Sequence, residues 1–338
     1  MKKFLIVVGV IFAVSIVAFG ISVAATGINV KEGFGIHFNG LELIRTEGEN
    51  SMKKGETYSS AFTKEQSESV GKLKISTTSA ETTISCDESI DEIRVNFTSN
   101  RPGTAFTADI VNDELVINES GFGFWVIFWW TGGENRLDVT LPKAEYEKMT
   151  LNSTSGTVKV DGLIFEDFNS TSTSGTSEYN IFADNIKAFT TSGRTTITNC
   201  TDRRAASLSF DTTSGSHNIN GFTADKFHIG STSGKIVANG ISGKGDVSLT
   251  SGKIEINYSD WNDDLEINVT SGSCVVNLPE GSGADARVDA LSGGMTIRNS
   301  DGTKASLSKA DSVSFGGENR HKIYADLTSG SIKVNIGE

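Results

Sequence analysis

The chain has 338 residues, with 36 Gly, only 3 Pro, 8% aromatic residues and a formal net charge of −12. This composition, together with the abundance of Ser and Thr, favours a long all-β body over a helical enzyme. The negative charge argues against a broad basic surface, so we expect no nucleic-acid partner.

The amino terminus carries a long apolar stretch. Residues 4–25 are uncharged and mostly apolar, and they follow Lys2 and Lys3. As a helix, this stretch would span about 33 Å, enough to cross a hydrocarbon core of about 30 Å. A cleaved secretory signal is the alternative, because residues 23–25 are small, although the apolar region of a signal is normally about 7 to 15 residues long. We favour a retained anchor over residues 1–25, which predicts a single-pass cell-membrane protein with an extracytoplasmic body.

The next segments lead into the body of the protein. Residues 26–71 are polar and contain glycines, and they are predicted to form a juxtamembrane lead-in. A β-solenoid domain is predicted over residues 72–338. Its first part has strand signals at 93–98, 105–111, 114–118 and 136–141. Asn112 and Asp113 read as a tight turn, so we expect irregular coils with a protruding aromatic hairpin near residues 105–130.

Residues 121–130, here called the aromatic segment, hold three of the four Trp residues of the chain. One interpretation is that these rings cap the open amino-terminal end of the solenoid. The other is that they form an interaction surface for the bilayer interface or a partner, because Trp is enriched at both. The candidate surface residues are Phe124, Trp125, Phe128, Trp129 and Trp130.

The rest of the chain is organised by the tripeptide Thr-Ser-Gly. Its serines are spaced 19, 18, 22, 19, 18, 20, 21 and 37 residues apart, and a related Thr-Ser-Ala lies upstream at Ser79. Repetition at a period of about 19–20 residues predicts a single-stranded β-helix, or β-solenoid, in which each coil stacks on the next. From residue 281 the pattern is looser, and residues 323–336 read as a regular final coil. The repeat serines are Ser155, Ser174, Ser192, Ser214, Ser233, Ser251, Ser271, Ser292 and Ser329.

Numbering each coil from its Ser shows apolar residues at offsets −6, −4, +3 and +5, as in Ile254 and Ile256. This period of two predicts one strand before the Ser and one after it, each with an apolar inner face. A further apolar residue at +8, such as Leu163, indicates a third short side. The Gly at +1 is predicted to form a corner with positive φ. Thr at −1 should form an outer ladder, and Thr or Ser at −2 should bond up and down the stack.

Residues that could carry chemistry are few. Cys86, Cys200 and Cys274 fall at positions typical of small core residues, and His217 occupies an inward position where a core histidine is expected. None of the zinc, nucleophile-elbow or phosphate-loop motifs occurs, so we predict no catalytic residues, metal or cofactor. Residues 260–264 match a calcium loop only in part, and a solvated loop is favoured there.

These features together resemble a known family. Its marks here are the amino-terminal membrane segment, Leu73-Lys74-Ile75 before Thr77-Thr78-Ser79, an aromatic patch followed by residues 137–143, and serial Thr-Ser-Gly coils. The combination resembles the bacterial putative adhesin family, a β-solenoid domain of unknown function often found in envelope proteins. The resemblance covers about residues 55–338, and it implies no catalytic residues. The chain departs from the pattern at Ala80, at Leu291 and near residue 311.

Two functions remain open from the sequence. The favoured one is a non-enzymatic, membrane-tethered, extracytoplasmic scaffold or adhesin of the cell envelope, with cell-wall glycan or an envelope protein as its partner. The alternative is a carbohydrate-active β-helix enzyme that acts on an envelope polysaccharide. Such enzymes need two carboxylates about 5 to 9.5 Å apart. Outward acids such as Glu178 and Glu255 lie four coils apart, so the sequence shows no such pair.

Overall fold

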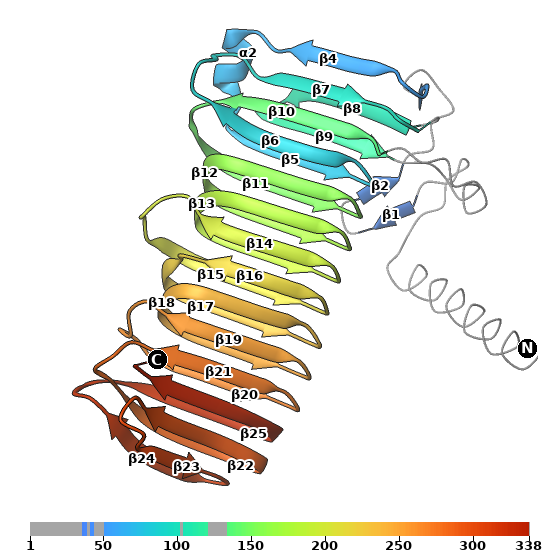
Figure 1. Cartoon of the computed structure of the whole chain (residues 1–338). Helices are drawn as coiled ribbons and strands as arrows, with labels where there is room; N and C mark the ends of the chain where they lie inside the picture. Colours follow the sequence, from blue (N-terminus) through green and yellow to red (C-terminus); the bar gives the residue numbers. More distant parts are fainter. Residues whose placement is uncertain (1–35, 39–40, 44–50, 102–103, 121–133, 338) are drawn as a thin grey trace, which may run out of the picture. The chain divides into compact units, whose positions relative to one another are not determined.

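The computed structural model describes residues 36–38, 41–43, 51–101, 104–120 and 134–337 (Figure 1). The chain divides into two compact units, residues 1–51 and 52–338. In the first unit, β1 (Ile36–Phe38) and β2 (Leu41–Leu43) form an antiparallel pair. The predicted anchor at residues 1–25 lies outside the described residues. Within the part of the chain that is described, no helix is long and apolar enough to cross a membrane.

The second unit is almost entirely strand. It contains one short helix, α2 (Lys64–Ser69), among its described residues. The strands of its first part are β3 (Ser51–Met52), β4 (Thr57–Ala61), β5 (Lys72–Thr77), β6 (Glu81–Asp87), β7 (Arg94–Thr98), β8 (Thr104–Val111), β9 (Glu114–Ser120) and β10 (Arg136–Pro142). The middle strands are β11 (Glu145–Ser153), β12 (Thr157–Ser172), β13 (Thr176–Thr190), β14 (Arg194–Asn199), β15 (Ala205–Thr212), β16 (Ser216–Asn220), β17 (Thr223–Ser231), β18 (Lys235–Leu249) and β19 (Lys253–Tyr258). The last are β20 (Leu265–Val269), β21 (Ser273–Leu278), β22 (Ser282–Asn299), β23 (Lys304–Leu307), β24 (Asp311–Gly316) and β25 (Asn319–Ile336).

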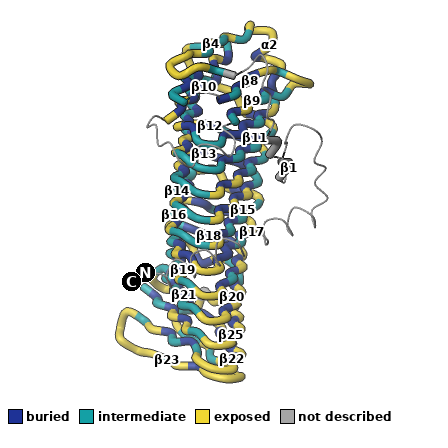
Figure 2. The backbone as a smooth tube through the Cα atoms, turned by 90° about the vertical axis from the view of Figure 1, so that its right-hand side faces the viewer, coloured by how far each residue is buried: buried dark blue, intermediate teal, exposed yellow. Residues whose placement is uncertain are grey.

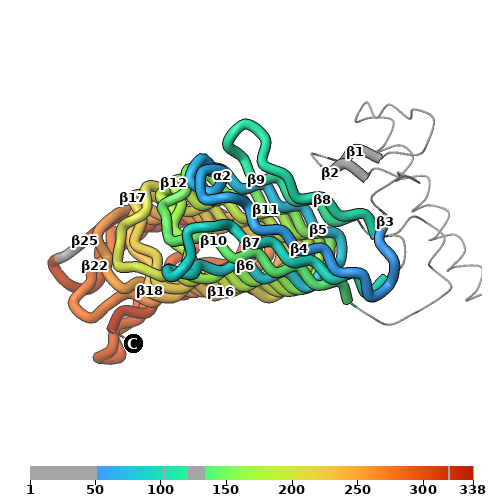
Figure 3. Tube along the Cα trace, turned by 90° about the horizontal axis from the view of Figure 1, so that it is seen from above, coloured from blue at the N-terminus to red at the C-terminus, as the bar shows by residue number. Residues whose placement is uncertain are grey.

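The middle strands stack as parallel coils, which confirms the all-β, solenoid-like architecture (Figures 1 and 3). The hydrogen-bonded registers pair Thr157 with Thr176, Thr176 with Arg194, and Arg194 with Ser216. These steps reproduce the spacing of the serines, because each coil must return to the same register before it can bond to the previous one.

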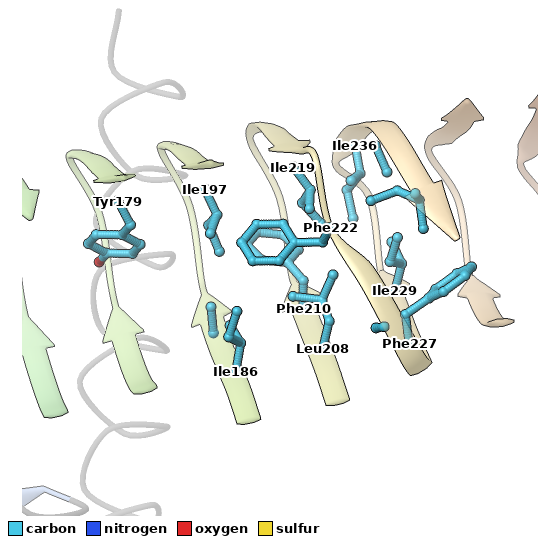
Figure 4. Close-up of a cluster of buried hydrophobic side chains, with 14 of the residues drawn as sticks. Tyr179, Ile186, Ile197, Leu208, Phe210, Ile219, Phe222, Phe227, Ile229 and Ile236 are labelled. Carbon is cyan, nitrogen blue, oxygen red and sulfur yellow. The ribbon is translucent and has the colours of Figure 1, made fainter. Parts of the chain in front are cut away.

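The apolar positions found in the sequence form one continuous core. Ile254 and Ile256 are fully buried, as are their counterparts in neighbouring coils, and the buried residues line the inside of the stack in Figure 2. Figure 4 shows a section of this core, where Phe210 and Phe222 meet aliphatic residues of adjacent coils. Leu163 at offset +8 is also buried. It lies in β12 beyond a register irregularity at Asp161, so the bend here is part of a continuous strand.

The tripeptide forms a corner between two strands. Gly175 has φ +102°, as predicted, and a Cβ there would lie 2.1 Å from the Gly156 carbonyl oxygen of the adjacent coil. At Gly234, Gly252, Gly272 and Gly330 φ is not positive, but a Cβ at Gly252 would still lie 2.1 Å from the Gly234 oxygen. Close stacking of the corners therefore requires glycine even where its left-handed conformation is not used.

The hydroxyls at the corner make two kinds of bond. Ser155 Oγ donates to the Thr78 carbonyl oxygen of the neighbouring coil at 2.9 Å, and Ser174 Oγ donates to that of Thr154 at 3.1 Å. The inward hydroxyls at −2 were expected to bond along the stack. Ser153 Oγ instead donates to the carbonyl oxygen two residues on, in its own corner. Thr212 Oγ1 does both, because it reaches the Thr190 and Ser214 oxygens.

At the amino-terminal end, the order of coils in space differs from their order in the sequence. The coil β5–β6 lies between β11–β12 on one side and β9–β10 on the other. Beyond β9–β10, antiparallel strands close the stack: β8 pairs with β9, β7 with β10, and β4 with β7. Strand β4 and helix α2 lie at this end in Figures 1 and 3, so part of the predicted lead-in takes part in the folded unit.

The carboxy-terminal end repeats this arrangement. The last coil in the sequence, β25, is not last in the stack, because it pairs with β20 and β21 on one side and with β22 on the other. Strands β23 and β24 pair antiparallel with β22 at the very end. The interval of 37 residues before Ser329 therefore reflects a coil that returns into the stack, since Ser292 and Ser329 are direct neighbours in the register.

Candidate functional site

The aromatic segment connects β9 to β10, at a position in the sequence where a corner of the stack is expected. Strands β9 and β10 pair with β5 and β6, with Asn118 opposite Ser76 and Arg136 opposite Glu81. Between these positions the β5–β6 coil has a corner of four residues, 77–80, whereas the β9–β10 coil has residues 119–135. The aromatic segment is thus an insertion at the place where other coils carry Thr-Ser-Gly.

The residues predicted to form the interaction surface, Phe124, Trp125, Phe128, Trp129 and Trp130, lie outside the described residues. Their flanking strands are placed on both sides. The predicted hairpin before them is present as β8 and β9, joined by Asn112 and Asp113 with φ of 51° and 61°. This left-handed pair is the two-residue turn that the sequence indicated.

A buried carboxylate holds the base of the insertion. Glu119 is 3% exposed and occupies the inward position that is Thr or Ser in the early coils. Its Oε2 accepts hydrogen bonds from the backbone N–H groups of Thr78 at 2.6 Å and Ser79 at 3.1 Å. Its Oε1 accepts from Asn135 Nδ2 at 2.8 Å, so the carboxylate joins the two ends of the insertion.

The bonds to Glu119 replace bonds that a regular corner would supply. In the adjacent coil, the N–H groups of Thr154 and Ser155 donate to the carbonyl oxygens of Thr77 and Thr78. The equivalent N–H groups of the β5–β6 coil face the insertion, and the Glu119 side chain accepts their bonds instead. A buried donor without a partner is costly, so the carboxylate allows the corner to open without loss of its bonds. Sequence reasoning missed this residue; the signal was an acidic side chain at an inward position.

The base of the insertion also lies close to the point where the chain enters the solenoid unit. Gly55 and Ser99 are joined by a backbone hydrogen bond of 2.6 Å. The backbone N–H of the next residue, Asn100, donates to Asn135 Oδ1 at 3.0 Å, and its side-chain Nδ2 donates to the Glu134 carbonyl oxygen at 2.6 Å. Residues near the start of the unit and residues 134–135 at the carboxy-terminal end of the insertion therefore meet at one side of the end coil.

Described residues outside the insertion cover the amino-terminal end of the core. The rings of Phe97 and Phe106 stack at 4.2 Å between centroids, and Tyr58 of β4 lies 5.1 Å from Phe106. Helix α2 begins with a capping box at Thr63, and Ser67 Oγ accepts the Ile93 N–H at 2.9 Å. The cap is therefore built by β4, β7, β8 and α2.

Other polar groups in the stack are engaged in the fold. His217 is fully buried, and burial lowers its pKa. Its Nε2 lies 3.0 Å from the Ser214 oxygen and 2.9 Å from Thr212 Oγ1, which makes this nitrogen the donor to the carbonyl. Cys86 and Cys200 are unpaired and half-buried, and burial raises the pKa of the buried Cys274 thiol to about 12. Within the described ranges, no group of His, Cys, Asp and Glu side chains is arranged to hold a metal ion.

One charged cluster on the outer face was not foreseen. His228 lies between two carboxylates from neighbouring coils, with Nε2 3.1 Å from Asp211 Oδ1 and Nδ1 2.7 Å from Asp246 Oδ2. The hydrogen bond to Asp211, followed by that to Asp246, raises the pKa of His228 to about 9. A Cβ at Gly230 would lie 2.1 Å from Asp211 Oδ1, so this glycine makes room for the pair.

Comparisons with known proteins give one family match and several distant solved structures. None of the curated proteins matches the chain. A putative cell adhesion protein from Clostridium sporogenes is 14% identical, with 84% of this chain and 100% of that one covered and a TM-score of 0.27. A putative adhesin from Parabacteroides distasonis is 12% identical over 82% of this chain and 97% of that one, with a TM-score of 0.44. A putative adhesin from Bacteroides fragilis is 9% identical over the same shares, with a TM-score of 0.36.

The identities and TM-scores of these solved structures are low, so the family of this chain is assigned from the family match alone. That match extends from residue 70 to residue 335 and includes the stacked coils and the insertion between β9 and β10. The chain therefore belongs to the Toastrack DUF4097 family, which confirms the predicted kinship with a solenoid domain of unknown function.

Proposed function

We propose that this protein is a non-enzymatic scaffold or adhesin of the cell envelope, tethered to the membrane by residues 4–25 with its solenoid outside. In this proposal the aromatic segment is the contact surface. Its partner is cell-wall glycan, an envelope protein or the bilayer interface. Aromatic rings on a protein surface are suited to contacts of this kind.

One observation carries the proposal: the solenoid end is covered without the aromatic segment. Phe97, Phe106 and Tyr58 already pack over the end of the core. A cap made of Trp and Phe would duplicate this cover. Large apolar rings that are not needed to close a core are typical of a binding surface.

The anchoring of the insertion supports the same conclusion. Glu119 and Asn135 hold both ends of the corner through buried hydrogen bonds, at the end of the stack where the chain enters. Fixing the two ends of an insertion leaves less of the chain to be ordered on binding, which lowers the ordering cost of binding.

The non-enzymatic part of the proposal rests on how the reactive side chains are used. The repeated serine hydroxyls that donate to neighbouring carbonyls, as in Ser155 and Ser174, serve the stack. His217 is buried, and His228 is held between two carboxylates. These groups are committed to the fold, so they do not form a nucleophile and base that face solvent.

Protease accessibility tests the topology. Protease added to intact cells, after removal of the wall, should digest the solenoid, while a cytoplasmic marker stays intact. A surface marker must be cut in the same sample. Survival of residues 52–338 under these conditions would contradict an extracytoplasmic body.

A further inference from the structure

Two buried hydroxyls lie beneath the corner of the β5–β6 coil. Thr77 is the last residue of β5 and Thr82 is the second residue of β6, so the two side chains point inward on either side of the corner. Both are 1% exposed, and neither Oγ1 has a hydrogen-bond partner within the part of the chain that the structure describes. A buried polar group without a protein partner is costly, and such groups commonly mark an ordered water or an ion.

In another coil, the same two positions satisfy each other. Thr190 and Thr195 occupy offsets −2 and +3 from the repeat Ser, and their Oγ1 atoms are 2.9 Å apart. Thr77 and Thr82 occupy the same offsets from Ser79. Two identical side chains in equivalent places are therefore bonded directly in one coil and not in the other. A direct bond does not satisfy the hydroxyls of the β5–β6 corner.

The neighbouring coils offer no polar side chain to Thr82. It lies opposite Val158 of β12 on one side and opposite Leu137 of β10 on the other. Both of these side chains are apolar and fully buried, so they neither donate nor accept a hydrogen bond. The polar groups that can reach the Thr82 hydroxyl therefore lie across the corner, on the side of Thr77.

Thr77 has a buried carboxylate beside it. Ser76 pairs with Asn118, so the next residues of the two strands, Thr77 and Glu119, occupy neighbouring places in the stack. A carboxylate offers about four acceptor sites, and three are taken by the bonds from Thr78, Ser79 and Asn135. Glu119 can therefore accept one more bond, from a small molecule between the two Thr hydroxyls.

We propose that this corner binds one ordered water molecule, which accepts hydrogen bonds from Thr77 Oγ1 and Thr82 Oγ1 and donates one to the Glu119 carboxylate. A buried water typically makes about three hydrogen bonds, which is the number that these groups provide. A metal cation fits less well, because it would use the hydroxyl oxygens as ligands and leave both hydroxyl hydrogens to find other acceptors. The water joins the β5–β6 corner to the base of the insertion and satisfies the inward hydroxyls where the corner opens.

A crystal structure of the full-length protein in detergent tests the site directly. We expect electron density for one atom at about 2.8 Å from both Thr oxygens, the usual length of an O–H···O bond. The density should be lost in Thr77→Val/Thr82→Val, because Val replaces each hydroxyl with a methyl group, and it should remain in Thr77→Ser/Thr82→Ser. Absence of the density from the wild type, or contacts of about 2.4 Å to several oxygens as around a calcium ion, would overturn the proposal.

Urea unfolding of the Val variants gives an independent check. With a shared water, Thr77→Val and Thr82→Val should each lower the urea midpoint, and the double variant should lower it by less than the sum, since its second substitution removes a hydroxyl that has already lost its partner. Thr190→Val, Thr195→Val and their double variant are matched controls that should show the same pattern, because this pair bonds directly. If Thr77→Val or Thr82→Val raises the midpoint while the controls lower it, the hydroxyls have no partner to lose and the proposal fails.

Discussion

Glu119→Ala should destabilise the amino-terminal end of the solenoid by more than the loss of one hydrogen bond would. The substitution removes the acceptor of three hydrogen bonds, from Thr78 N–H, Ser79 N–H and Asn135 Nδ2. A buried donor left without a partner costs about 1 to 3 kcal/mol, so the three together should cost about 3 kcal/mol or more. Glu119→Gln, which retains one carbonyl oxygen, should fall between this variant and the wild type.

Two measurements check this expectation. Urea unfolding gives the change in stability, and hydrogen exchange at residues 78–79 should show faster exchange in Glu119→Ala, because the N–H groups have lost their acceptor. Glu114→Ala is the matched control, since it removes a carboxylate near the start of the same strand, β9, where the side chain is only half-buried. The reasoning fails if Glu119→Ala is no more destabilising than Glu114→Ala and exchange at residues 78–79 is unchanged.

Two further predictions concern the core and the outer face. Ile256→Asp places an unpaired charge at a fully buried position and should lower the unfolding free energy by several kcal/mol, whereas Glu255→Gln in the same strand should stay within about 0.5 kcal/mol; equal melting shifts would refute the assigned faces. The folded pKa of His228 is raised above the ordinary 6.5 to about 9, so its stabilisation is fully present below pH 6.5 and is lost as the pH rises to about 9. The melting difference between wild type and His228→Asn should follow that window, and a pH-independent difference would show that the contacts with Asp211 and Asp246 do not stabilise the fold through charge.

The regular middle of the molecule could be predicted from the sequence because the repeat allows only one arrangement of parallel coils. Parallel stacking fixes the length of each coil, and the alternation of apolar residues fixes the inner face. The serine spacing therefore gave the hydrogen-bond registers, and residues such as Ile254 and Ile256 were assigned to the core correctly. The turn at Asn112 and Asp113 was predictable for a similar local reason.

The ends of the stack were not predictable in the same way. The coil motif is alike in β5–β6, β22 and β25, so it does not tell which coil lies beside which. That order lies in pairings between strands that are far apart in the sequence, such as β5 with β11 and β25 with β20. Helix α2 was missed because it is short and lies in a polar segment, where its capping box is the main signal.

The candidate site was only partly visible from the sequence. The cluster of Trp and Phe marked the segment, but its position at a corner became evident only when Asn118 and Arg136 were placed opposite Ser76 and Glu81. Glu119 was overlooked because an acidic residue in a strand usually reads as an outward side chain. Its burial is explained by donors that lie 41 and 40 residues earlier in the chain or at the far end of the insertion.

The claim that the aromatic segment is a contact surface is tested most directly by replacing Trp129 and Trp130 separately with Ser. For each variant, thermal stability is measured together with binding to liposomes and to isolated envelope fractions. Neighbouring residues in an extended chain point to opposite sides, so the two rings should differ in their roles. We predict that at least one substitution lowers binding while the melting temperature stays nearly unchanged. If both substitutions lower the melting temperature and neither lowers binding independently of it, the segment is part of the cap and the contact surface is refuted.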